Sequence, residues 1–380
     1  MTGSNSFWFA NPGGNFYNGV ATQSLRFDDG SSDYLTRTPS GAGNQKTWTF
    51  STWLKRSILN PQSQILSVGN TGAGSPWFLM YFADDDNLNV YWYTSGTVNS
   101  NQTFTPKFRD TSAWYNIVLR MDTTQNTDSN RVKVYINGVE APHGNTQYPT
   151  KDYDTLINGT SAHHIGRHGG GSYFDGYLAE TIMLDGTSTD ASSFGETKNG
   201  IWIPIDTSGL TFGTNGFRLE YKETSVGSGS SSTIGADTSG QNNHWTSSGI
   251  VASDCNMPDS PENNFSTWNA LWTGGEQSAS IAAAPTLSEG NLQVSLGQNA
   301  YIGNTFRPIS GKWYCEIRVK TIGSTNGEID WGWLQATTYA GTTGHSGQAN
   351  KWGAYYHAYS TDHIQVYDET SQLGSNINLT

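Results

Sequence analysis

Hydrophobic and polar residues alternate along several short stretches of this chain. In 47–54, Trp48, Phe50 and Leu54 fall on one side of an extended backbone. In 312–320, the residues Trp313, Cys315, Ile317 and Val319 alternate with polar ones. A period of two residues is typical of a β-strand with one buried face. Both stretches are therefore predicted to be strands.

Other stretches complete an all-β pattern. The run 77–82 is continuously apolar, which predicts a central strand. Further strands are predicted at 88–93, 114–121 and 131–136. Asn137-Gly138 follows the last of these and predicts a hairpin turn, because both turn positions need a positive φ. No helical heptad repeat is visible, so coiled-coil assembly is not predicted. The many aromatic residues and glycines suit an all-β chain of antiparallel β-sandwiches.

The first part of the chain resembles a laminin G-like, or concanavalin A-like, domain. The resemblance begins at Ser24-Leu-Arg-Phe-Asp-Asp-Gly30 and spans roughly residues 20–190. A late core strand of the form Phe-x-Gly-x-Leu-x-Glu is represented by Phe174, Gly176, Leu178 and Glu180. Domains of this family usually bind rather than catalyse.

The C-terminal part resembles a SPRY domain, whose opening strand is similar to Gly311-Lys-Trp-Tyr-Cys-Glu-Ile317. We predict an N-terminal arm at 1–23, a laminin G-like sandwich at 24–222, a Gly/Ser-rich connector at 223–285 and a SPRY-like sandwich at 286–380. We expect the second sandwich to be incomplete at its C-terminal end and the natural product to be longer, because an unfinished sheet exposes strand edges.

Charge and cysteine content restrict the partners. The net charge is −12 and the sequence pI is about 5.0. Nucleic acid and anionic membranes require clustered Lys and Arg, so neither is an expected partner. The two cysteines, Cys255 and Cys315, have no zinc-ligand spacing and are expected to be free thiols. The first residues lack the basic and apolar regions of a signal peptide, so export by that route is not expected.

An enzymatic interpretation is disfavoured by the motif at 328–334. Laminarinase-type glycoside hydrolases use Glu-x-Asp-x-x-Glu on one strand, with two carboxylates as nucleophile and acid/base. Glu328 and Asp330 are present, but Trp333 stands where the second Glu is needed. No catalytic residue is therefore predicted, and the protein is expected not to be an enzyme.

Calcium is considered at two acidic turns. Asp84, Asp85 and Asp86 offer oxygen ligands between two strands, and Asp28-Asp29 is a weaker candidate of the same kind. The alternative at both sites is a solvated acidic turn without calcium, because Asp favours turns. The cluster of His163, His164, His168 and Asp175 is expected not to chelate a metal, because adjacent side chains on a strand point to opposite faces.

Ligand binding and anchoring are assigned to aromatic residues. Trp92, Tyr93, Trp331 and Trp333 could stack on sugar rings, although most aromatic residues of a sandwich fill its core. In the arm, aromatic residues could anchor the chain to a particle as hot spots do. These residues are Phe7, Trp8, Phe9, Phe16 and Tyr17.

The order of the two domains, with the connector between them, resembles structural proteins of bacteriophages. This resemblance implies a non-enzymatic virion protein of a tailed phage, a tail fibre or receptor-binding appendage that recognises a glycan or protein on the host surface. It also implies assembly with other tail proteins and a homo-oligomer, which in such fibres is often a trimer. A capsid decoration or head fibre protein and a polysaccharide-degrading enzyme remain as alternatives.

Overall fold

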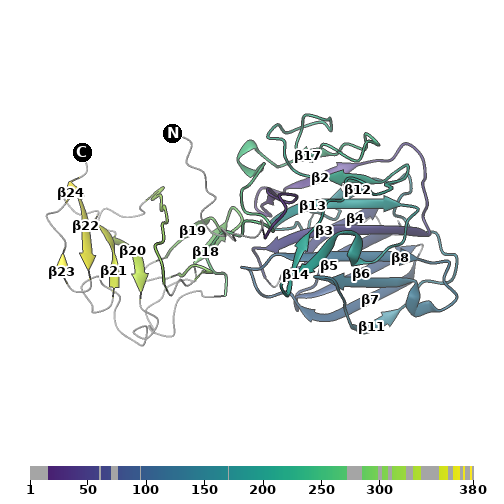
Figure 1. Cartoon of the computed structure of the whole chain (residues 1–380), viewed down its shortest axis with the longest axis horizontal. Helices are drawn as coiled ribbons and strands as arrows, with labels where there is room; N and C mark the ends of the chain where they lie inside the picture. The colour runs from purple at the N-terminus through teal and green to yellow at the C-terminus, as the bar shows by residue number, and fades with distance from the viewer. Residues whose placement is uncertain are drawn as a thin grey trace. The chain divides into compact units, whose positions relative to one another are not determined.

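The computed structural model describes residues 16–59, 61–69, 76–94, 96–169, 171–271, 285–297, 302–306 and 310–321, together with the backbone of the strands between 328 and 378. The chain forms two compact units (Figure 1). The first comprises Met1–Trp272, Thr286–Ser295 and Ile302–Phe306, and the second comprises Thr273–Pro285, Leu296–Tyr301 and Arg307–Thr380.

Two antiparallel sheets build the first unit. The seven-stranded sheet has the order β1-β13-β3-β8-β9-β10, with β16 also pairing β13. Its strands are β1 (Leu25–Phe27), β3 (Thr47–Arg56), β8 (Tyr115–Asp122), β9 (Val132–Ile136), β10 (Val139–Glu140), β13 (Gly176–Asp185) and β16 (Phe217–Leu219). The eight-stranded sheet has the order β11-β7-β6-β5-β4-β12-β2-β17. Its strands are β2 (Tyr34–Arg37), β4 (Ser63–Gly69), β5 (Trp77–Phe82), β6 (Asn87–Thr94), β7 (Thr97–Lys107), β11 (His143–Gln147), β12 (His163–Ile165) and β17 (Thr246–Ser248).

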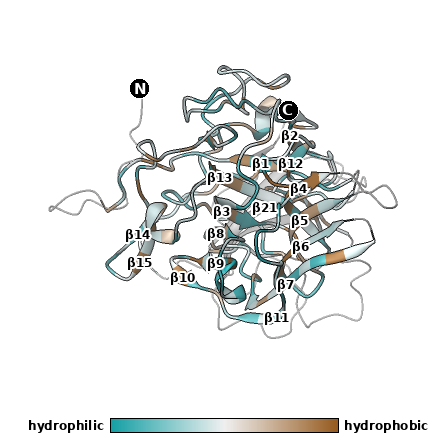
Figure 2. Ribbon diagram, turned by 90° about the vertical axis from the view of Figure 1, so that its right-hand side faces the viewer, coloured by the Kyte–Doolittle hydropathy of each residue, from teal (hydrophilic) through white to brown (hydrophobic). Residues whose placement is uncertain are grey.

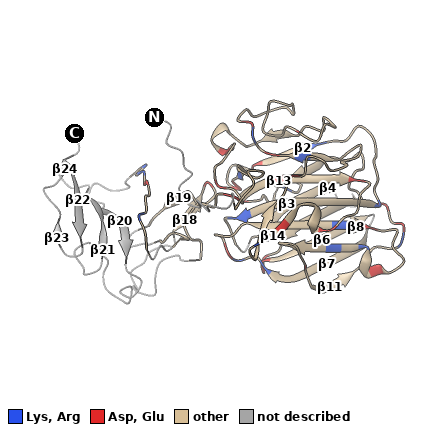
Figure 3. Cartoon of the chain, viewed as in Figure 1, with Lys and Arg blue, Asp and Glu red and all other residues tan. Residues whose placement is uncertain are grey.

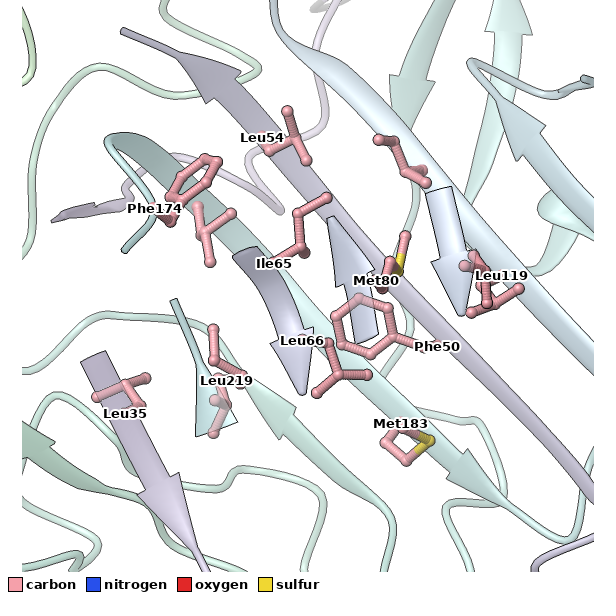
Figure 4. Packing of buried hydrophobic residues seen from close by; sticks show 14 of the residues in the cluster. Leu35, Phe50, Leu54, Ile65, Leu66, Met80, Leu119, Phe174, Met183 and Leu219 are labelled. Carbon is pink, nitrogen blue, oxygen red and sulfur yellow. The ribbon is translucent and has the colours of Figure 1, made fainter. Parts of the chain in front are cut away.

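The inner faces of the two sheets form one apolar core, in which Leu54, Phe50 and Met183 of one sheet meet Leu66 and Met80 of the other (Figure 4). The alternation predicted for 47–54 is confirmed, because Trp48, Phe50 and Leu54 all lie in this core. Burying alternate residues of every strand removes apolar surface from water on both sheets at once. The predicted all-β sandwich is therefore confirmed for this part of the chain.

The predicted hairpin is also confirmed. Asn137 and Gly138 have φ angles of 47° and 82°, as a type I′ turn requires, and they join β9 to β10. The space at this turn is also limited, since a Cβ on Gly138 would lie 2.5 Å from the ring of Trp202.

Residues after β13 cover the outer face of the seven-stranded sheet. A second apolar cluster joins Val118, Ile182 and Leu184 of that sheet to Phe194 and Phe212. The covering segment contains η2 (Ala191–Ser193) and a hairpin of β14 (Gly195–Lys198) and β15 (Ile201–Pro204). The outer face of this sheet is thus a second packed interface.

The first part of the predicted connector also belongs to the first unit. Its Trp245 is fully buried, and β17 pairs with β2. The 3-10 helix η3 (Ala252–Asp254) ends at the carboxylate that pairs with Arg26 at 2.5 Å, and Asp259 pairs with Lys55 at 2.8 Å. The Gly/Ser composition of 225–232 therefore serves tight turns, in which Gly227 N donates to Ser247 Oγ at 2.7 Å. The hairpin of β18 (Thr286–Ser288) and β19 (Gln293–Ser295) is part of the same unit.

The second unit contains an antiparallel five-stranded sheet with the order β20-β21-β22-β23, in which β24 also pairs β22. Its strands are β20 (Glu328–Leu334), β21 (Lys351–His357), β22 (His363–Asp368), β23 (Ser371–Gln372) and β24 (Ile377–Asn378). The strand predicted at 312–320 is not formed: residues 310–321 carry no strand assignment, and Trp313 is 44% exposed. Alternation alone does not make a strand, because the backbone also needs a partner for its hydrogen bonds.

Helix occurs in the described residues only as three-residue 3-10 turns. None of the described helices is long and apolar enough to cross a membrane.

Candidate functional site

The two sides of β5 have different roles. Phe78, Met80 and Phe82 point into the core, where each is fully buried. Trp77, Leu79 and Tyr81 alternate with them and must lie on the opposite side of the sheet. Trp77 and Tyr81 are only half-buried. The outer face of the eight-stranded sheet is therefore not a plain polar surface.

Strand β6 extends this row of aromatic residues. In the antiparallel register Trp77 opposes Tyr93, Leu79 opposes Tyr91 and Tyr81 opposes Asn89. The rings of Trp77 and Tyr93 are stacked, with centroids 4.6 Å apart and an interplanar angle of 18°. Figure 2 shows strands β4 to β7 of this sheet side by side. We call Trp77, Tyr81, Tyr91 and Tyr93 the aromatic face.

Polar groups adjoin the aromatic face on β7. Tyr91 opposes Asn101, and Asn89 opposes Thr103, whose hydroxyl donates to Asn89 Oδ1 at 2.5 Å. Burial raises the pKa of Tyr81, with a further contribution from the neighbouring Tyr91. The aromatic face thus combines ring faces with hydroxyl and amide groups.

The loop after β12, described at residues 166–169 and 171–173, borders the aromatic face on the other side. Ser67 Oγ of β4 donates to the carbonyl of Arg167 at 2.7 Å, so the loop crosses the outer side of β4. The guanidinium of Arg167 lies 4.2 Å from the ring centre of Tyr34, and the ring of His168 lies 6.1 Å from that of Trp77. Both residues thus connect this loop to aromatic rings of the sheet.

Several buried polar atoms beside this loop have no hydrogen-bond partner among the described residues. They are Trp77 Nε1, His164 Nδ1, Arg167 Nε, His168 Nε2 and both amide atoms of Gln64. Burial, with Arg167 and His168 nearby, lowers the pKa of His164 to about 4, so the imidazole is neutral at pH 7. An unpaired buried polar group costs about 1–3 kcal/mol, which native proteins rarely accept without a function.

The four predicted ligand-binding residues have different outcomes. Trp92 is fully buried in the core, where it stacks between Phe78 and Tyr153, so it has no ring face for a ligand. Tyr93 lies on the aromatic face. The side chains of Trp331 and Trp333 lie outside the described residues, although their backbone forms part of β20.

The predicted calcium turn is occupied by the protein's own cations. Asp86 is 1% exposed and binds Arg56 at 3.0 Å and Arg109 at 2.9 Å. Asp85 binds Lys107 at 2.9 Å. Only Asp84 and Asp85 are exposed, so this turn does not present a three-carboxylate calcium site, and its buried Asp instead fixes the strand ends.

Of the aromatic residues predicted to anchor the chain to a particle, the structure describes two. Phe7, Trp8 and Phe9 lie outside the described part of the chain. Phe16 and Tyr17 pack edge-to-face at 4.8 Å, and the carbonyl of Phe16 accepts from Lys198 Nζ at 2.7 Å. These contacts hold the end of the predicted arm on the chain's own surface.

His163 and His164 confirm the prediction that adjacent histidines diverge. On the core side, His163 Nε2 accepts from Asn158 N at 3.1 Å and its Nδ1 bonds to the carbonyl of Ser161 at 2.8 Å. His164 lies on the outer side, with its ring 5.9 Å from that of Tyr34. The side chains of Glu328 and Asp330 lie outside the described residues.

Comparison with known proteins identifies the first sandwich. Residues 29–192 match the family model described as the concanavalin A-like lectin/glucanases superfamily, Laminin_G_3. This part of the chain is a domain with the concanavalin A-like lectin fold, so the laminin G-like resemblance is confirmed. The SPRY resemblance and the phage origin stay predictions. A search of the curated proteins gave no match.

Solved structures with a similar arrangement have low sequence identity. A candidate carbohydrate binding protein from Bacteroides ovatus is 17% identical, with a TM-score of 0.40, over 61% of this chain and 59% of that protein. This chain thus spans less than two thirds of that protein. A heptameric SAP-like pentraxin from Limulus polyphemus is 16% identical, with a TM-score of 0.33, over 45% of this chain and 80% of its own. The CBM40 of the Ruminococcus gnavus IT-sialidase, bound to α2,6 sialyllactose, is 14% identical, with a TM-score of 0.32, over 45% of this chain and 94% of its own.

Sequence reasoning missed most of the aromatic face. The continuous apolar run 77–82 predicts one buried strand. Trp77, Leu79 and Tyr81 nevertheless occur at every second position, so they share one side of that strand. The signal was the combination of this spacing with Tyr91 and Tyr93, since two aromatic pairs with polar tips on adjacent strands indicate a half-exposed surface.

Proposed function

We propose that this protein is a non-catalytic glycan-binding protein and that the aromatic face is its binding surface. The observation that supports this proposal is the array of four half-buried aromatic side chains on the outer side of β5 and β6. Pyranose rings have an apolar C–H side and a polar rim. Aromatic ring faces can cover the first, while hydroxyl and amide groups bind the second.

The surroundings favour an uncharged sugar over an anionic one. Among the residues of the aromatic face and their β7 neighbours Asn101 and Thr103, none carries a charge, and Arg167 stands only at the border. Figure 3 shows that charged residues are sparse along the strands of this sheet. The overall charge of −12 would also weaken association with anionic glycans.

The test is a glycan array followed by calorimetry on the strongest ligand. Tyr91→Thr and Tyr93→Thr remove one ring each and place a β-branched residue, which is well tolerated in strands, at the position. Each is expected to weaken binding roughly 10- to 100-fold, because loss of one stacked ring costs about 1–3 kcal/mol. Tyr91→Phe keeps the ring and separates stacking from hydrogen bonding.

A matched control lies on the other sheet. Tyr135 of β9 is also half-buried, but it packs against the cover of the seven-stranded sheet. Tyr135→Thr should leave glycan affinity unchanged in protein whose circular dichroism is that of the parent. Equal losses in Tyr91→Thr and Tyr135→Thr would contradict the proposed surface.

The absence of catalysis is a separate part of the proposal. Glycoside hydrolysis requires two carboxyl groups about 5–10 Å apart across the sugar. None of the residues named on the aromatic face is acidic. Prolonged incubation with the bound glycan should therefore give no new reducing ends, and sustained release would favour the alternative of a polysaccharide-degrading enzyme.

We also propose, from the resemblance of the domain order, that the protein is a virion appendage of a tailed phage. Several copies on one particle would make weak single-site binding effective through avidity. Immunogold labelling of intact particles tests the location. Labelling at the tail supports this proposal, whereas detection only in soluble cell extract would contradict it without affecting glycan binding.

A further inference from the structure

A second group of aromatic and basic residues lies on the eight-stranded sheet beyond β4. Tyr34 of β2 is half-buried, and its ring lies 5.9 Å from that of His164 and 6.4 Å from that of Tyr173. The guanidinium of Arg167 lies 4.2 Å from the ring centre of Tyr34. We call Tyr34, His164, Arg167 and Tyr173 the second aromatic cluster.

The second aromatic cluster lies on the same side of the sheet as the aromatic face. Leu35 of β2 and Ile165 of β12 are fully buried in the core between the sheets. Their neighbours Tyr34 and His164 therefore point to the opposite side, because successive side chains of a strand alternate between its faces. Both groups of rings thus belong to the outer face of the eight-stranded sheet.

A row of facing residues connects the two groups across the strands. In the antiparallel registers Tyr91 opposes Leu79, and Leu79 opposes Ser67. Ser67 in turn opposes His164. Figure 2 shows β6, β5, β4, β12 and β2 following one another along this sheet. Four steps of about 4.8 Å separate β6 from β2, so the aromatic rings are distributed over a width of about 19 Å.

Polar atoms of the second aromatic cluster supply an independent observation. His164 is 9% exposed, and its Nδ1 has no hydrogen-bond partner among the described residues. The same is true of Arg167 Nε, and no described Asp or Glu lies within 4.0 Å of that guanidinium. Buried polar groups of native proteins are hydrogen-bonded, and sugar hydroxyls both donate and accept, so they suit an imidazole and a guanidinium alike.

Arg167 combines two kinds of contact in one side chain. A guanidinium over an aromatic ring uses its face for the ring and its N–H edge for hydrogen bonds. Its planar fork can donate to two neighbouring hydroxyl oxygens, while the half-buried rings of Tyr34 and Tyr173 offer apolar area to the C–H side of a sugar. Ring faces beside hydrogen-bonding groups are also what the aromatic face presents at β5 to β7.

We propose that the second aromatic cluster is a further sugar subsite, and that the ligand is a linear, uncharged oligosaccharide chain lying across the strands from β6 to β2. This assignment rests on the proposed function, because both groups of rings lie on one outer face. Once a chain is held at the aromatic face, its contact with the second cluster becomes intramolecular. A chain that reaches both groups is therefore bound more tightly than a short one.

Calorimetry with fragments of graded length tests the subsite. The fragments, from disaccharide to hexasaccharide, are prepared by partial acid hydrolysis of the neutral polysaccharide with the strongest glycan-array signal. Affinity of the parent protein should rise with length until the chain spans both groups and then stay constant. Tyr34→Thr should weaken binding of the hexasaccharide about tenfold, as loss of one stacked ring does, and leave the disaccharide unaffected. Tyr91→Thr should weaken both.

Two further variants separate the contacts within the cluster. Tyr34→Phe keeps the ring and should bind the hexasaccharide as the parent does. Arg167→Lys keeps the charge but loses the planar fork, so it should weaken binding of the hexasaccharide and not that of the disaccharide. Tyr135→Thr on the seven-stranded sheet is the matched control and should bind every length as the parent does.

The outcomes distinguish the subsite from the proposed function. A glycan array without any bound glycan contradicts the proposed function itself. Equal hexasaccharide affinity in Tyr34→Thr and the parent, or an affinity of the parent that does not change with length, overturns the subsite alone. An equal loss for disaccharide and hexasaccharide in Tyr34→Thr also overturns it, because such a loss reports a change in the whole face; circular dichroism and the urea midpoint of each variant are measured on the same preparations.

Discussion

The outer faces of the two sheets in the first unit differ in how far other residues cover them. On the seven-stranded sheet, Val118 and Ile182 pack beneath Phe194 and Phe212 of the segment that follows β13. On the eight-stranded sheet, the aromatic face stays half-buried. The chain thus uses its later residues to close one apolar outer surface, whereas the aromatic residues of the second outer surface keep part of their area exposed.

Residues around Asp259 add to the cover of the seven-stranded sheet, where a buried ion pair to Lys55 of β3 holds them. Lys55 and Asp259 are 1% and 5% exposed at their side chains and lie 2.8 Å apart. Burial lowers the pKa of Lys55, and the charge and hydrogen bond of Asp259 act in the opposite direction. Such a pair adds little net stability by itself, but removal of one partner leaves an uncompensated buried charge.

The largest effect is therefore expected from Asp259→Ala. The substitution leaves the buried Lys55 ammonium without its carboxylate partner and removes the acceptor of Trp114 Nε1. The free energy of unfolding should therefore fall by about 4 kcal/mol. Urea denaturation followed by tryptophan fluorescence measures it. The double variant Lys55→Met/Asp259→Leu should recover most of the loss, and a loss below about 1 kcal/mol for Asp259→Ala would show that residues 255–265 do not hold the cover.

Phe194→Ala tests the apolar part of the same cover. Phe194 is 2% exposed, and truncation of a buried Phe typically costs about 3.5 kcal/mol through lost burial and a cavity. Because Phe194 packs on the opposite sheet from the aromatic face, glycan affinity at 10 °C should equal that of the parent. A change in affinity in folded protein would mean that the two outer faces are coupled.

A pH titration compares the two sides of strand β12. Burial lowers the pKa of His163 from 6.5 to about 4, and both of its ring nitrogens are hydrogen-bonded as in the neutral form. The unfolded state therefore binds more protons between these values, so this stabilising contribution is complete above pH 6.5 and is lost as the pH falls towards 4. The loss amounts to about 3 kcal/mol.

His163→Gln should flatten that part of the stability curve. The difference in unfolding free energy between the parent and the variant, measured by urea denaturation at pH 7.0 and pH 4.5, should shrink at the lower pH. An unchanged difference would show that His163 does not titrate with folding. His164→Gln on the outer side provides the comparison, since the pKa of His164 is also lowered to about 4 but its Nδ1 has no described partner.

The sequence was sufficient where local pattern and tertiary contact agree. Alternation located β3, and Asn137-Gly138 located the hairpin, because each is determined by residues close in the chain. It failed for Trp92, whose burial depends on Phe78 of strand β5 and Tyr153 of the segment between β11 and β12. It also failed for Asp86, whose partners Arg56 and Arg109 are distant in sequence. Which side of a strand faces solvent, and which carboxylate meets a cation, are properties of strand pairing that a single sequence does not encode locally.

The smallest stability effect is expected on the aromatic face itself. Tyr91 is half-buried and is not part of the core cluster, and Thr has a high strand propensity, so Tyr91→Thr should change the unfolding free energy by less than about 1 kcal/mol. The same substitution is expected to remove most glycan affinity. Tyr91→Thr should thus lower affinity with little change in stability, whereas Phe194→Ala should lower stability with no change in affinity. Urea denaturation and calorimetry on the same preparations measure both quantities. A stability loss as large as that of Phe194→Ala would mean that Tyr91 is a packing residue, and the distinction between a closed and an available outer face would then be lost.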